Sequence, residues 1–246
     1  MYKVSRNTVE ILGVKIDNLK VGEALERIEQ LIEEGRRGAP KYIIKPNTEI
    51  VTYAQSDAQF KKILNNADLA PPDGVGLMIG SRLLSSGLSQ RVGGPDLTEA
   101  ILKLAEDKGY SCYFYGAKPK VIEKLSLVLK KRFPKLKIAG LRHGYVEKDE
   151  SVVVEIKTVK PDILFVALGY PKQEKWIATN LNDFKVPLSI AEGGSFDFIS
   201  GETKRAPYWM RKLGLEWLFR LIIEPGRIRR QMALPKFLWL IFSKRK

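Results

Sequence analysis

The chain has 246 residues, 44% of them hydrophobic, which is enough to bury the core of a large α/β domain with or without an appendage. Its single cysteine, Cys112, excludes an intrachain disulfide, and it has neither a signal-peptide core nor a run of roughly 20 apolar residues, so we expect a cytoplasmic protein that does not cross a bilayer. The net charge of +14 is uneven, because residues 205–246 carry +9 and residues 1–204 only +5, and such a basic tail indicates an anionic partner.

Predicted strands and helices alternate along most of the chain. The predicted strands lie at 41–45, 67–70, 111–115, 137–141, 163–168 and 187–191, after two short strands within 9–16 that turn at Gly13. The predicted helices lie at 21–35, 48–54, 97–108, 118–132, 149–160 and 208–223, with others that begin after Ser56, at Val75 and near Lys172. Asn47 and Ser56 are expected to cap the helices that follow them, and Gly35 to end the first helix. This alternation predicts an α/β fold, Rossmann-like, with a mainly parallel sheet covered by helices on both faces over 1–204 and a C-terminal helical appendage over 205–246.

The stretch 161–182 is the one around which the chain is organised. An unbroken apolar run from Ile163 is typical of a strand buried on both faces, and Gly169, Tyr170 and Pro171 end it before a helix begins. Ligands of open α/β sheets bind at such strand ends, where the free N–H groups of a helix favour an anion such as a diphosphate. We therefore expect the side chains of Gln173 and Glu174 to project into a crevice. An ordinary turn between strand and helix explains this stretch alone equally well.

Two other strand ends carry polar residues that can converge on the same pocket. They read Lys45-Pro46-Asn47 and Pro72-Asp73-Gly74. The carboxylate of Asp73 is placed to take a proton from an attacking hydroxyl. From the residues alone, capping of the following helix is the favoured role for Asp73, and it is an equal alternative for Asn47.

Several other chemistries have little support in the sequence. The single histidine, His143, cannot build a metal site without a cysteine pair, so no metal is predicted, and hydrogen bonding within a loop is its expected role. Glycine motifs for dinucleotides and for phosphate loops are absent, as is the nucleophile elbow of α/β-hydrolases. Gly193-Gly194-Ser195 permits close backbone approach to a phosphate or a sugar.

The tail combines apolar stripes with basic residues. A helix over 208–223 would align Met210, Leu213, Trp217 and Leu221, and the apolar run 237–242 ends in Lys244-Arg245-Lys246. This pattern is typical of helices that lie in a membrane interface, where each basic residue near an anionic leaflet contributes about 1 kcal/mol. The alternatives are that 208–223 packs on the core, or that the tail binds nucleic acid, which its bulky apolar residues disfavour.

Six motifs, in order across nearly the whole chain, resemble the WecG/TagA/CpsF family of bacterial glycosyltransferases. The first three are Pro46-Asn47-x-Glu49, Pro72-Asp73-Gly74-x-Gly76 and Arg91-Val92-x-Gly94-x-Asp96. The next two are Gly169-x-Pro171-Lys172-Gln173-Glu174 and Gly193-Gly194-x-Phe196-Asp197-x-x-x-Gly201. The last is Arg205-Ala206-Pro207-x-Trp209, followed by Gly214-Leu215-Glu216-Trp217-x-x-Arg220-Leu221 and Glu224-Pro225.

The resemblance implies an inverting, metal-independent transfer, without a cofactor, from a UDP-sugar to a polyprenyl-diphosphate-linked sugar at the cytoplasmic membrane face. For the TagA-like branch, N-acetylmannosamine moves onto undecaprenyl-diphosphate-N-acetylglucosamine and begins wall teichoic acid. A different donor, UDP-N-acetylmannosaminuronic acid or UDP-glucose, is the alternative within the family. A non-catalytic basic module that binds RNA or anionic lipid is the alternative outside it. The expected partners are the two substrates and an anionic membrane surface, without nucleic acid, and a homo-oligomer is left open.

The resemblance also assigns candidate site residues. Asp73 is the expected base. The expected substrate-binding residues are Lys45, Asn47, Arg91, Gly169, Gln173, Gly193 and Gly194. The appendage arginines expected at the diphosphate are Arg205, Arg211, Arg220 and Arg227. Two positions depart from the family pattern: Lys45 stands where threonine is usual and is a candidate phosphate contact, and Glu192 precedes the glycine pair.

Overall fold

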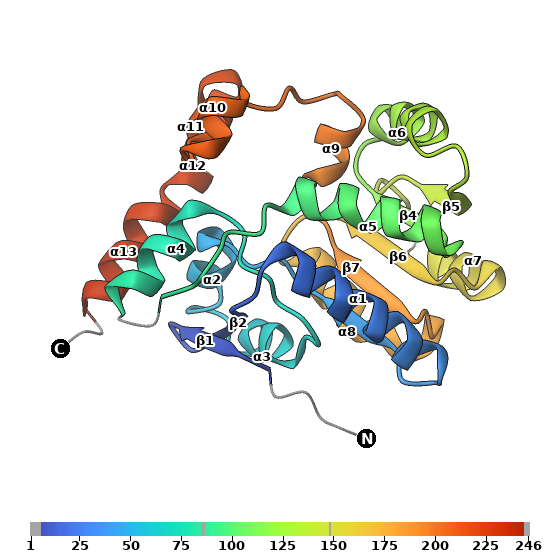
Figure 1. Cartoon of the computed structure of the whole chain (residues 1–246), viewed down its shortest axis with the longest axis horizontal. Coiled ribbons are helices and arrows are strands. Elements are labelled where there is room, and N and C mark those ends of the chain that lie inside the picture. The colour runs from blue at the N-terminus through green and yellow to red at the C-terminus, as the bar shows by residue number, and fades with distance from the viewer. Residues whose placement is uncertain (1–5, 85–86, 148, 244–246) are drawn as a thin grey trace.

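The computed structural model describes residues 6–84, 87–147 and 149–243, without the side chains of Arg227, Arg229 and Gln231 (Figure 1). Its centre is a five-stranded sheet in the order β3-β7-β6-β4-β5, and every neighbouring pair is parallel. The strands are β3 (Lys41–Ile43), β4 (Ser111–Gly116), β5 (Lys137–Arg142), β6 (Ile163–Ala167) and β7 (Leu188–Ala191). A separate antiparallel hairpin is formed by β1 (Thr8–Ile11) and β2 (Val14–Asp17). The predicted α/β class is confirmed.

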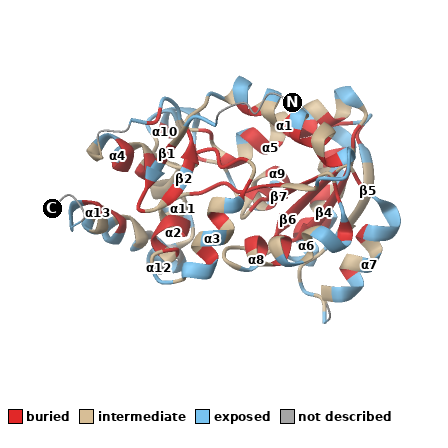
Figure 2. Cartoon of the chain, turned by 90° about the horizontal axis from the view of Figure 1, so that it is seen from below, coloured by how far each residue is buried: buried red, intermediate tan, exposed pale blue. Residues whose placement is uncertain are grey.

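Helices cover both faces of the sheet, because successive strand residues are apolar on both sides. In β4, Cys112 and Phe114 join one core cluster while Tyr113 and Tyr115 join the other. The first cluster lies under α1 (Val21–Arg36), α5 (Gly94–Lys108), α6 (Pro119–Arg132) and α9 (Ser195–Ile199). The second lies under α2 (Thr48–Tyr53), α3 (Ala58–Asn66), α7 (Asp149–Val159) and α8 (Lys172–Phe184). Figure 2 shows β4, β6 and β7 as a buried layer between helices.

The C-terminal segment returns to the first third of the chain. It contains α10 (Tyr208–Lys212), α11 (Glu216–Ile223), the short 3₁₀ helix η1 (Pro225–Arg227), α12 (Ile228–Gln231) and α13 (Ala233–Ser243). Phe237 and Ile241 of α13 are fully buried, packed against α2 and α4 (Val75–Leu83). At Gly80 of α4, an added Cβ would lie 2.6 Å from the Phe237 ring, so the two helices meet where no side chain fits. None of the described helices is long and apolar enough to span a bilayer. The division of the chain at residue 205 stays a prediction.

Three local predictions are wrong. The helix predicted over 208–223 is broken at Gly214, which has φ +74° and, with a Cβ, would approach Val75 to 3.1 Å. Asp57 rather than Ser56 caps α3, because its carboxylate accepts the backbone N–H of Phe60 at 2.8 Å. Residues 67–70 form only an isolated bridge, between Leu69 and β3, instead of a strand.

The end of α1 also differs slightly from prediction. Gly35 lies inside the last turn of α1 rather than after it. A Cβ at Gly35 would come within 2.1 Å of the Pro187 carbonyl oxygen, so glycine here permits close packing against the entry to β7.

Candidate active site

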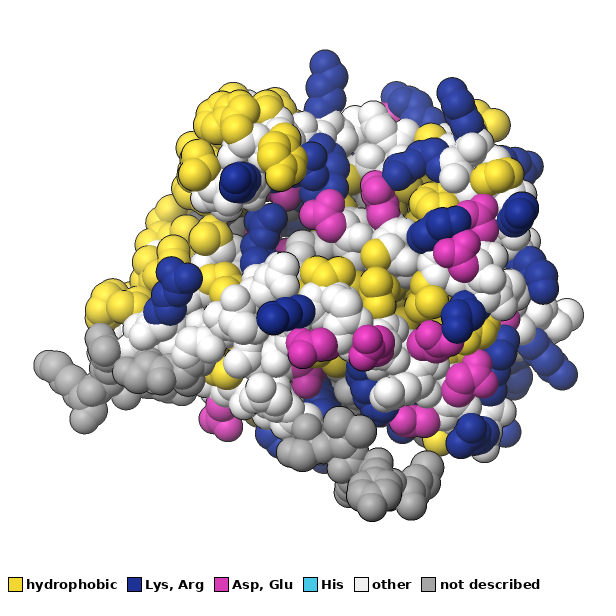
Figure 3. Space-filling model, viewed as in Figure 1, with side chains coloured by type: hydrophobic (Ala, Val, Ile, Leu, Met, Phe, Trp, Pro, Cys, Tyr) yellow, Lys and Arg dark blue, Asp and Glu magenta, His cyan; other side chains and the backbone are white. Residues whose placement is uncertain are grey.

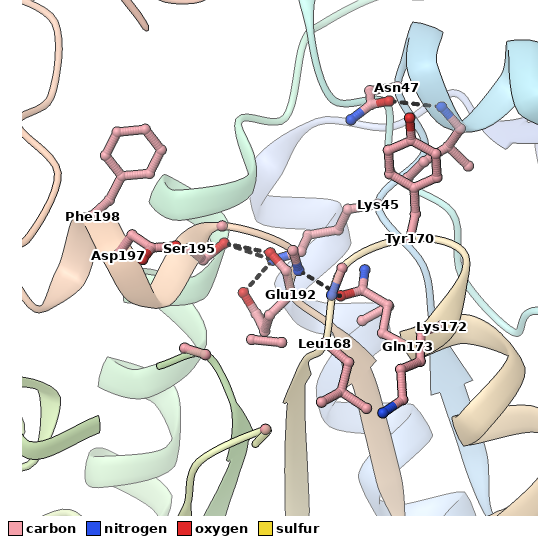
Figure 4. Close-up of a pocket in the computed structure, with 18 of the residues that line it drawn as sticks. Lys45, Asn47, Leu168, Tyr170, Lys172, Gln173, Glu192, Ser195, Asp197 and Phe198 are labelled. Atoms are coloured by element: carbon pink, nitrogen blue, oxygen red, sulfur yellow. Dashed lines mark hydrogen bonds and ion pairs between the residues drawn. The ribbon is translucent and has the colours of Figure 1, made fainter. Parts of the chain in front are cut away.

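A cavity of about 440 Å³ lies at the carboxyl edge of the sheet (Figure 4). Its walls include the segments after all five strands of the sheet: Lys45 and Asn47 after β3, Ala117 and Lys118 after β4, Gly144 and Tyr145 after β5, Leu168 to Tyr170 with Lys172 and Gln173 after β6, and Glu192 to Ser195 after β7. The strand order reverses between β4 and β6, so the cavity occupies the position at which open α/β sheets bind ligands. Asp73 and Gln173 line this same cavity.

Asp73 is held in place by its backbone rather than by a helix cap. Its N–H donates to the carbonyl of Pro46 at 2.9 Å, and the carbonyl of Pro72 accepts from Val92 at 2.8 Å. The N-cap of α4 is Gly74, at φ +90° and with no side-chain cap. The capping role favoured for Asp73 from the residues alone is therefore wrong.

The Asp73 side chain is half-buried at the cavity wall, and partial removal of its carboxylate from water raises its pKa. The Lys45 ammonium, the Gly94 backbone N–H and Arg91 all act in the opposite direction. A Cβ at Gly94 would lie 2.9 Å from Oδ2 of Asp73, which shows how closely the backbone approaches the carboxylate. The group is thus a carboxylate with increased affinity for a proton, as a general base requires.

Asn47 and Arg91 line a cavity together with Asp73. The Oδ1 atom of Asn47 accepts the Ile50 N–H at 3.0 Å and caps α2, as predicted, while the residue also lines the cavity. Arg91 lines an adjoining cavity of about 160 Å³, whose walls again include Asn47 and Asp73. Both candidate substrate-binding residues are therefore next to the candidate base.

Gln173 ties the two glycine loops together. Its Oε1 atom accepts the backbone N–H of Gly169 at 3.1 Å and that of Gly193 at 3.0 Å, so the loops after β6 and β7 share one acceptor. These two N–H groups, which belong to predicted substrate-binding residues, are used within the protein. Gly194 lines the cavity beside them.

Glu174 does not project into the crevice, contrary to prediction. It is fully buried, and Gln173 Nε2 donates to its Oε1 atom at 2.9 Å. Burial raises the pKa of Glu174 to about 7.

Lys45 and Glu192, the two departures from the family pattern, contact each other. Nζ of Lys45 lies 2.5 Å from Oε2 of Glu192, and it also donates to Thr98 at 3.0 Å. Both residues line the cavity (Figure 4). The ammonium predicted as a phosphate contact is thus directed at protein oxygens.

The appendage arginines divide into two groups. Arg220 lines both cavities and lies over the Phe198 ring at 4.4 Å. Arg205 pairs with Asp96 at 2.6 Å, and Arg211 lies 3.7 Å from the same carboxylate. Neither arginine lines either of the two cavities described above. Arg227 was also predicted to reach the diphosphate, but its side chain lies outside the described part of the structure.

Other cavity residues were missed by sequence reasoning. Arg230 reaches the cavity from α12, although the sequence marked it only as part of a basic run. Lys118 and Tyr145 also line the cavity, in the segments that follow β4 and β5. Their position just after predicted strands is the feature of the sequence that could have identified them. The backbone N–H of Tyr145 donates to Nδ1 of His143 at 3.3 Å, which confirms a loop hydrogen bond for that histidine. Within the described ranges, no three His, Cys, Asp or Glu side chains gather as a metal site would require.

This fold and site define an α/β protein with a polar pocket at a topological switch point, containing a half-buried carboxylate and bordered by cationic side chains. The model of the Glycosyl transferase WecG/TagA/CpsF family matches residues 9–246. An N-acetylglucosaminyldiphosphoundecaprenol N-acetyl-beta-D-mannosaminyltransferase of Staphylococcus aureus (strain NCTC 8325 / PS 47) is 36% identical over 240 residues, 97% of this chain and 94% of its own length. A protein of the same name from Bacillus subtilis (strain 168) is 39% identical over 200 residues, 81% of this chain and 78% of its own. The chain belongs to the WecG/TagA/CpsF family of glycosyltransferases, as its motifs indicate.

Proposed function

We propose that this glycosyltransferase transfers N-acetylmannosamine from its UDP donor to undecaprenyl-diphosphate-N-acetylglucosamine. The names of both relatives describe a mannosaminyl transfer to this acceptor, and one of them matches 97% of the chain. The observation that carries the proposal is the Asp73 carboxylate in the same cavity as the Gln173 loop, at the switch point of the sheet. The cavity volume of about 440 Å³ lies within the range of small-molecule sites.

In the proposed reaction, the acceptor hydroxyl attacks the anomeric carbon of the donor sugar. Asp73 takes the hydroxyl proton as the new glycosidic bond forms. The bond from the anomeric carbon to the phosphate oxygen breaks, and UDP leaves with its electron pair, so that the configuration at carbon inverts. Arg220 and Arg230 line the cavity and supply positive charge to the departing diphosphate. Asn47, Arg91 and Gln173 hold the substrates around the base.

The surface of the appendage supports action on a lipid-linked acceptor. Its exposed large apolar side chains are Tyr208, Trp209, Leu213, Ile222, Ile223, Ile228, Met232, Trp239 and Phe242, and we call them the apolar face. Figure 3 shows hydrophobic side chains gathered along the edge formed by α10 to α13. Lys212 and Lys236 are exposed in the same segment. We infer that this face enters the interface of an anionic membrane and brings the cavity to the acceptor.

The test is a donor screen with the full chain and a soluble analogue of the lipid-linked acceptor. UDP-N-acetylmannosamine is expected to give the disaccharide product, with inverted configuration by NMR, while UDP-glucose and UDP-N-acetylmannosaminuronic acid give much less. A different preferred donor would place the chain in another branch of its family. If every UDP-sugar fails both to react and to raise the melting temperature, a non-catalytic basic module would be favoured instead.

A further inference from the structure

Lys45 and Glu192 form a buried ion pair that the proposed reaction does not use directly. In the paired strands β3 and β7, Ile43 lies opposite Ile190, so two residues later the register brings Lys45 beside Glu192. Their side chains are 5% and 0% exposed, and their charged atoms are 2.5 Å apart. Figure 4 shows Lys45, from the segment after β3, reaching Glu192 and Ser195 of the segment after β7.

A structural role alone is a weak explanation for this pair. Removing two charges from water costs several kcal/mol per ion, and well-packed apolar residues often stabilise a core as well or better. The ammonium is hydrogen-bonded to Thr98 and, at 3.4 Å, to Ser195, so its three N–H groups have acceptors. The Oε1 atom of Glu192 is buried and has no hydrogen-bond partner among the described residues. Keeping this ion pair buried therefore costs free energy of folding, and the pair lies at the wall of the candidate active-site cavity.

The lysine end of the pair lies next to Asp73. A Cβ placed on Gly94 would be 2.9 Å from Oδ2 of Asp73 and 3.9 Å from Cδ of Lys45, so both side chains lie close to this glycine. After burial, which raises the pKa of Asp73, Lys45 has the largest influence on that pKa and lowers it. The other charged groups around Asp73 act in both directions: Arg91 lowers its pKa and Glu216 of α11 raises it, while Glu49 of α2 and Arg220 of α11 line the same cavities.

We propose that Lys45 and Glu192 are positioning residues that tune the proton affinity of the Asp73 carboxylate. Lys45 favours the carboxylate, and Glu192 holds the ammonium in place and reduces its field. This inference rests on the proposed role of Asp73 as the base. The inference explains why Lys45 and Glu192, the two departures from the family pattern, occur together in this chain.

The two single substitutions are expected to act in opposite directions. Lys45→Met removes the positive charge and leaves a carboxyl group unpaired, both of which raise the pKa of Asp73. The acid limb of the kcat/KM profile, which reports ionised Asp73, then moves to higher pH. Glu192→Gln keeps the shape of the side chain but leaves the ammonium uncompensated, so the limb moves to lower pH. Shifts of about half a pH unit or more are expected in each direction.

The experiment measures kcat/KM from about pH 5 to about pH 9 for the full chain with UDP-N-acetylmannosamine and the acceptor analogue. The variants are Lys45→Met, Glu192→Gln and the double variant, whose limb should fall between those of the two single variants. Melting temperatures identify any variant that fails to fold. If Lys45→Met fails to fold, the two remaining variants still test the inference. The acid limb of the Glu192→Gln profile must then lie at lower pH than the acid limb of the double variant.

Coincident limbs, or limbs that move in the same direction, would overturn the inference. This outcome differs from failure of the proposed function. If Asp73→Asn retains normal turnover, the assignment of the base is wrong. If Asp73→Asn abolishes turnover while the limbs coincide, Asp73 keeps its role and only the function of the ion pair is refuted.

Discussion

At the scale of single residues, Gln173 organises the candidate site as well as lining it. One carbonyl oxygen accepts two backbone N–H groups from different loops, and its amide nitrogen is oriented by Glu174. The glycine loops are thus held in place before any ligand binds. Preorganised groups of this kind lower the cost of stabilising charge in a transition state.

Gln173→Leu is expected to lower both stability and turnover. The substitution removes the acceptor of the half-buried N–H groups of Gly169 and Gly193, and each lost hydrogen bond costs about 0.5–1.5 kcal/mol. Urea denaturation should therefore show a decrease of about 2 kcal/mol or more in the free energy of unfolding. Gln59→Leu is the matched control, because Gln59 is exposed on α3 and should change neither quantity. Equal stability of the two variants would contradict the bracing role of Gln173.

Glu174 predicts a specific pH dependence of stability. Its pKa is raised by burial from 4.5 to about 7, so the folded state binds the proton more tightly than the unfolded state. Its contribution to stability is then fully present below about pH 4.5 and is lost as the pH rises to about 7, a change on the order of 3 kcal/mol. Glu174→Gln should remove this loss, so that its unfolding free energy falls less than that of the wild type between the two pH values. Parallel curves for the two proteins would show that Glu174 is not the group responsible.

At the scale of elements, the five strands of the central sheet were readily predicted from the sequence, whereas the irregular connections were not. The unbroken apolar run of β6 and the strand ends at Asn47 and Gly169 were recognisable from residue type alone. The break at Gly214 depends on its close approach to Val75, which comes from a distant part of the chain. Apolar periodicity continues through the break, so a single helix was the natural prediction.

The site shows the same limit at longer range. Residues 45 and 192 are brought together by the register of β3 and β7, and a single sequence does not contain that register. The cavity position of Arg230 depends likewise on how the appendage folds back. Asp73 was recognised as a candidate base through the resemblance, whereas its residue type alone favoured a helix cap.

The packing of α13 on α4 predicts a position-specific cost for a single methyl group. Gly80→Ala places a Cβ 2.6 Å from the buried Phe237 ring, and overpacking of this kind typically costs about 1–3 kcal/mol. Gly22→Ala in α1 is the control, because no atom lies within 4 Å of the added Cβ, and it should leave stability unchanged or slightly raised. Hydrogen exchange in α13 should become faster only in the first variant. Unchanged exchange there would contradict the docking of α13 on α4.

At the scale of the whole molecule, charge and apolar surface are concentrated at the end of the chain. The apolar face lies on α10 to α13, while Phe237 and Ile241 anchor the same segment to the core. The segment therefore has two apolar sides with different roles. One side packs on the core of the domain, and the other is exposed and can enter a bilayer interface.

Trp209→Glu with Trp239→Glu is expected to release the protein from anionic vesicles. Both indoles are exposed, at 59% and 66%, so the fold should tolerate the change. Turnover of acceptor embedded in vesicles should fall, while turnover of a soluble acceptor analogue is maintained. Leu127→Glu, at a 69% exposed position on α6, is the control and should bind vesicles like the wild type. Equal cosedimentation of all three proteins would exclude the apolar face as the membrane contact.

The central claim is that the Asp73 carboxylate, in the same cavity as the Gln173 loop, is the base of the transfer, and turnover of Asp73→Asn tests it most directly. The asparagine keeps the size of the side chain but cannot accept the acceptor's proton. We predict an unchanged fold by circular dichroism and a decrease in kcat of at least about 100-fold, the scale of general base catalysis. A correctly folded Asp73→Asn enzyme with near-normal kcat would contradict the account.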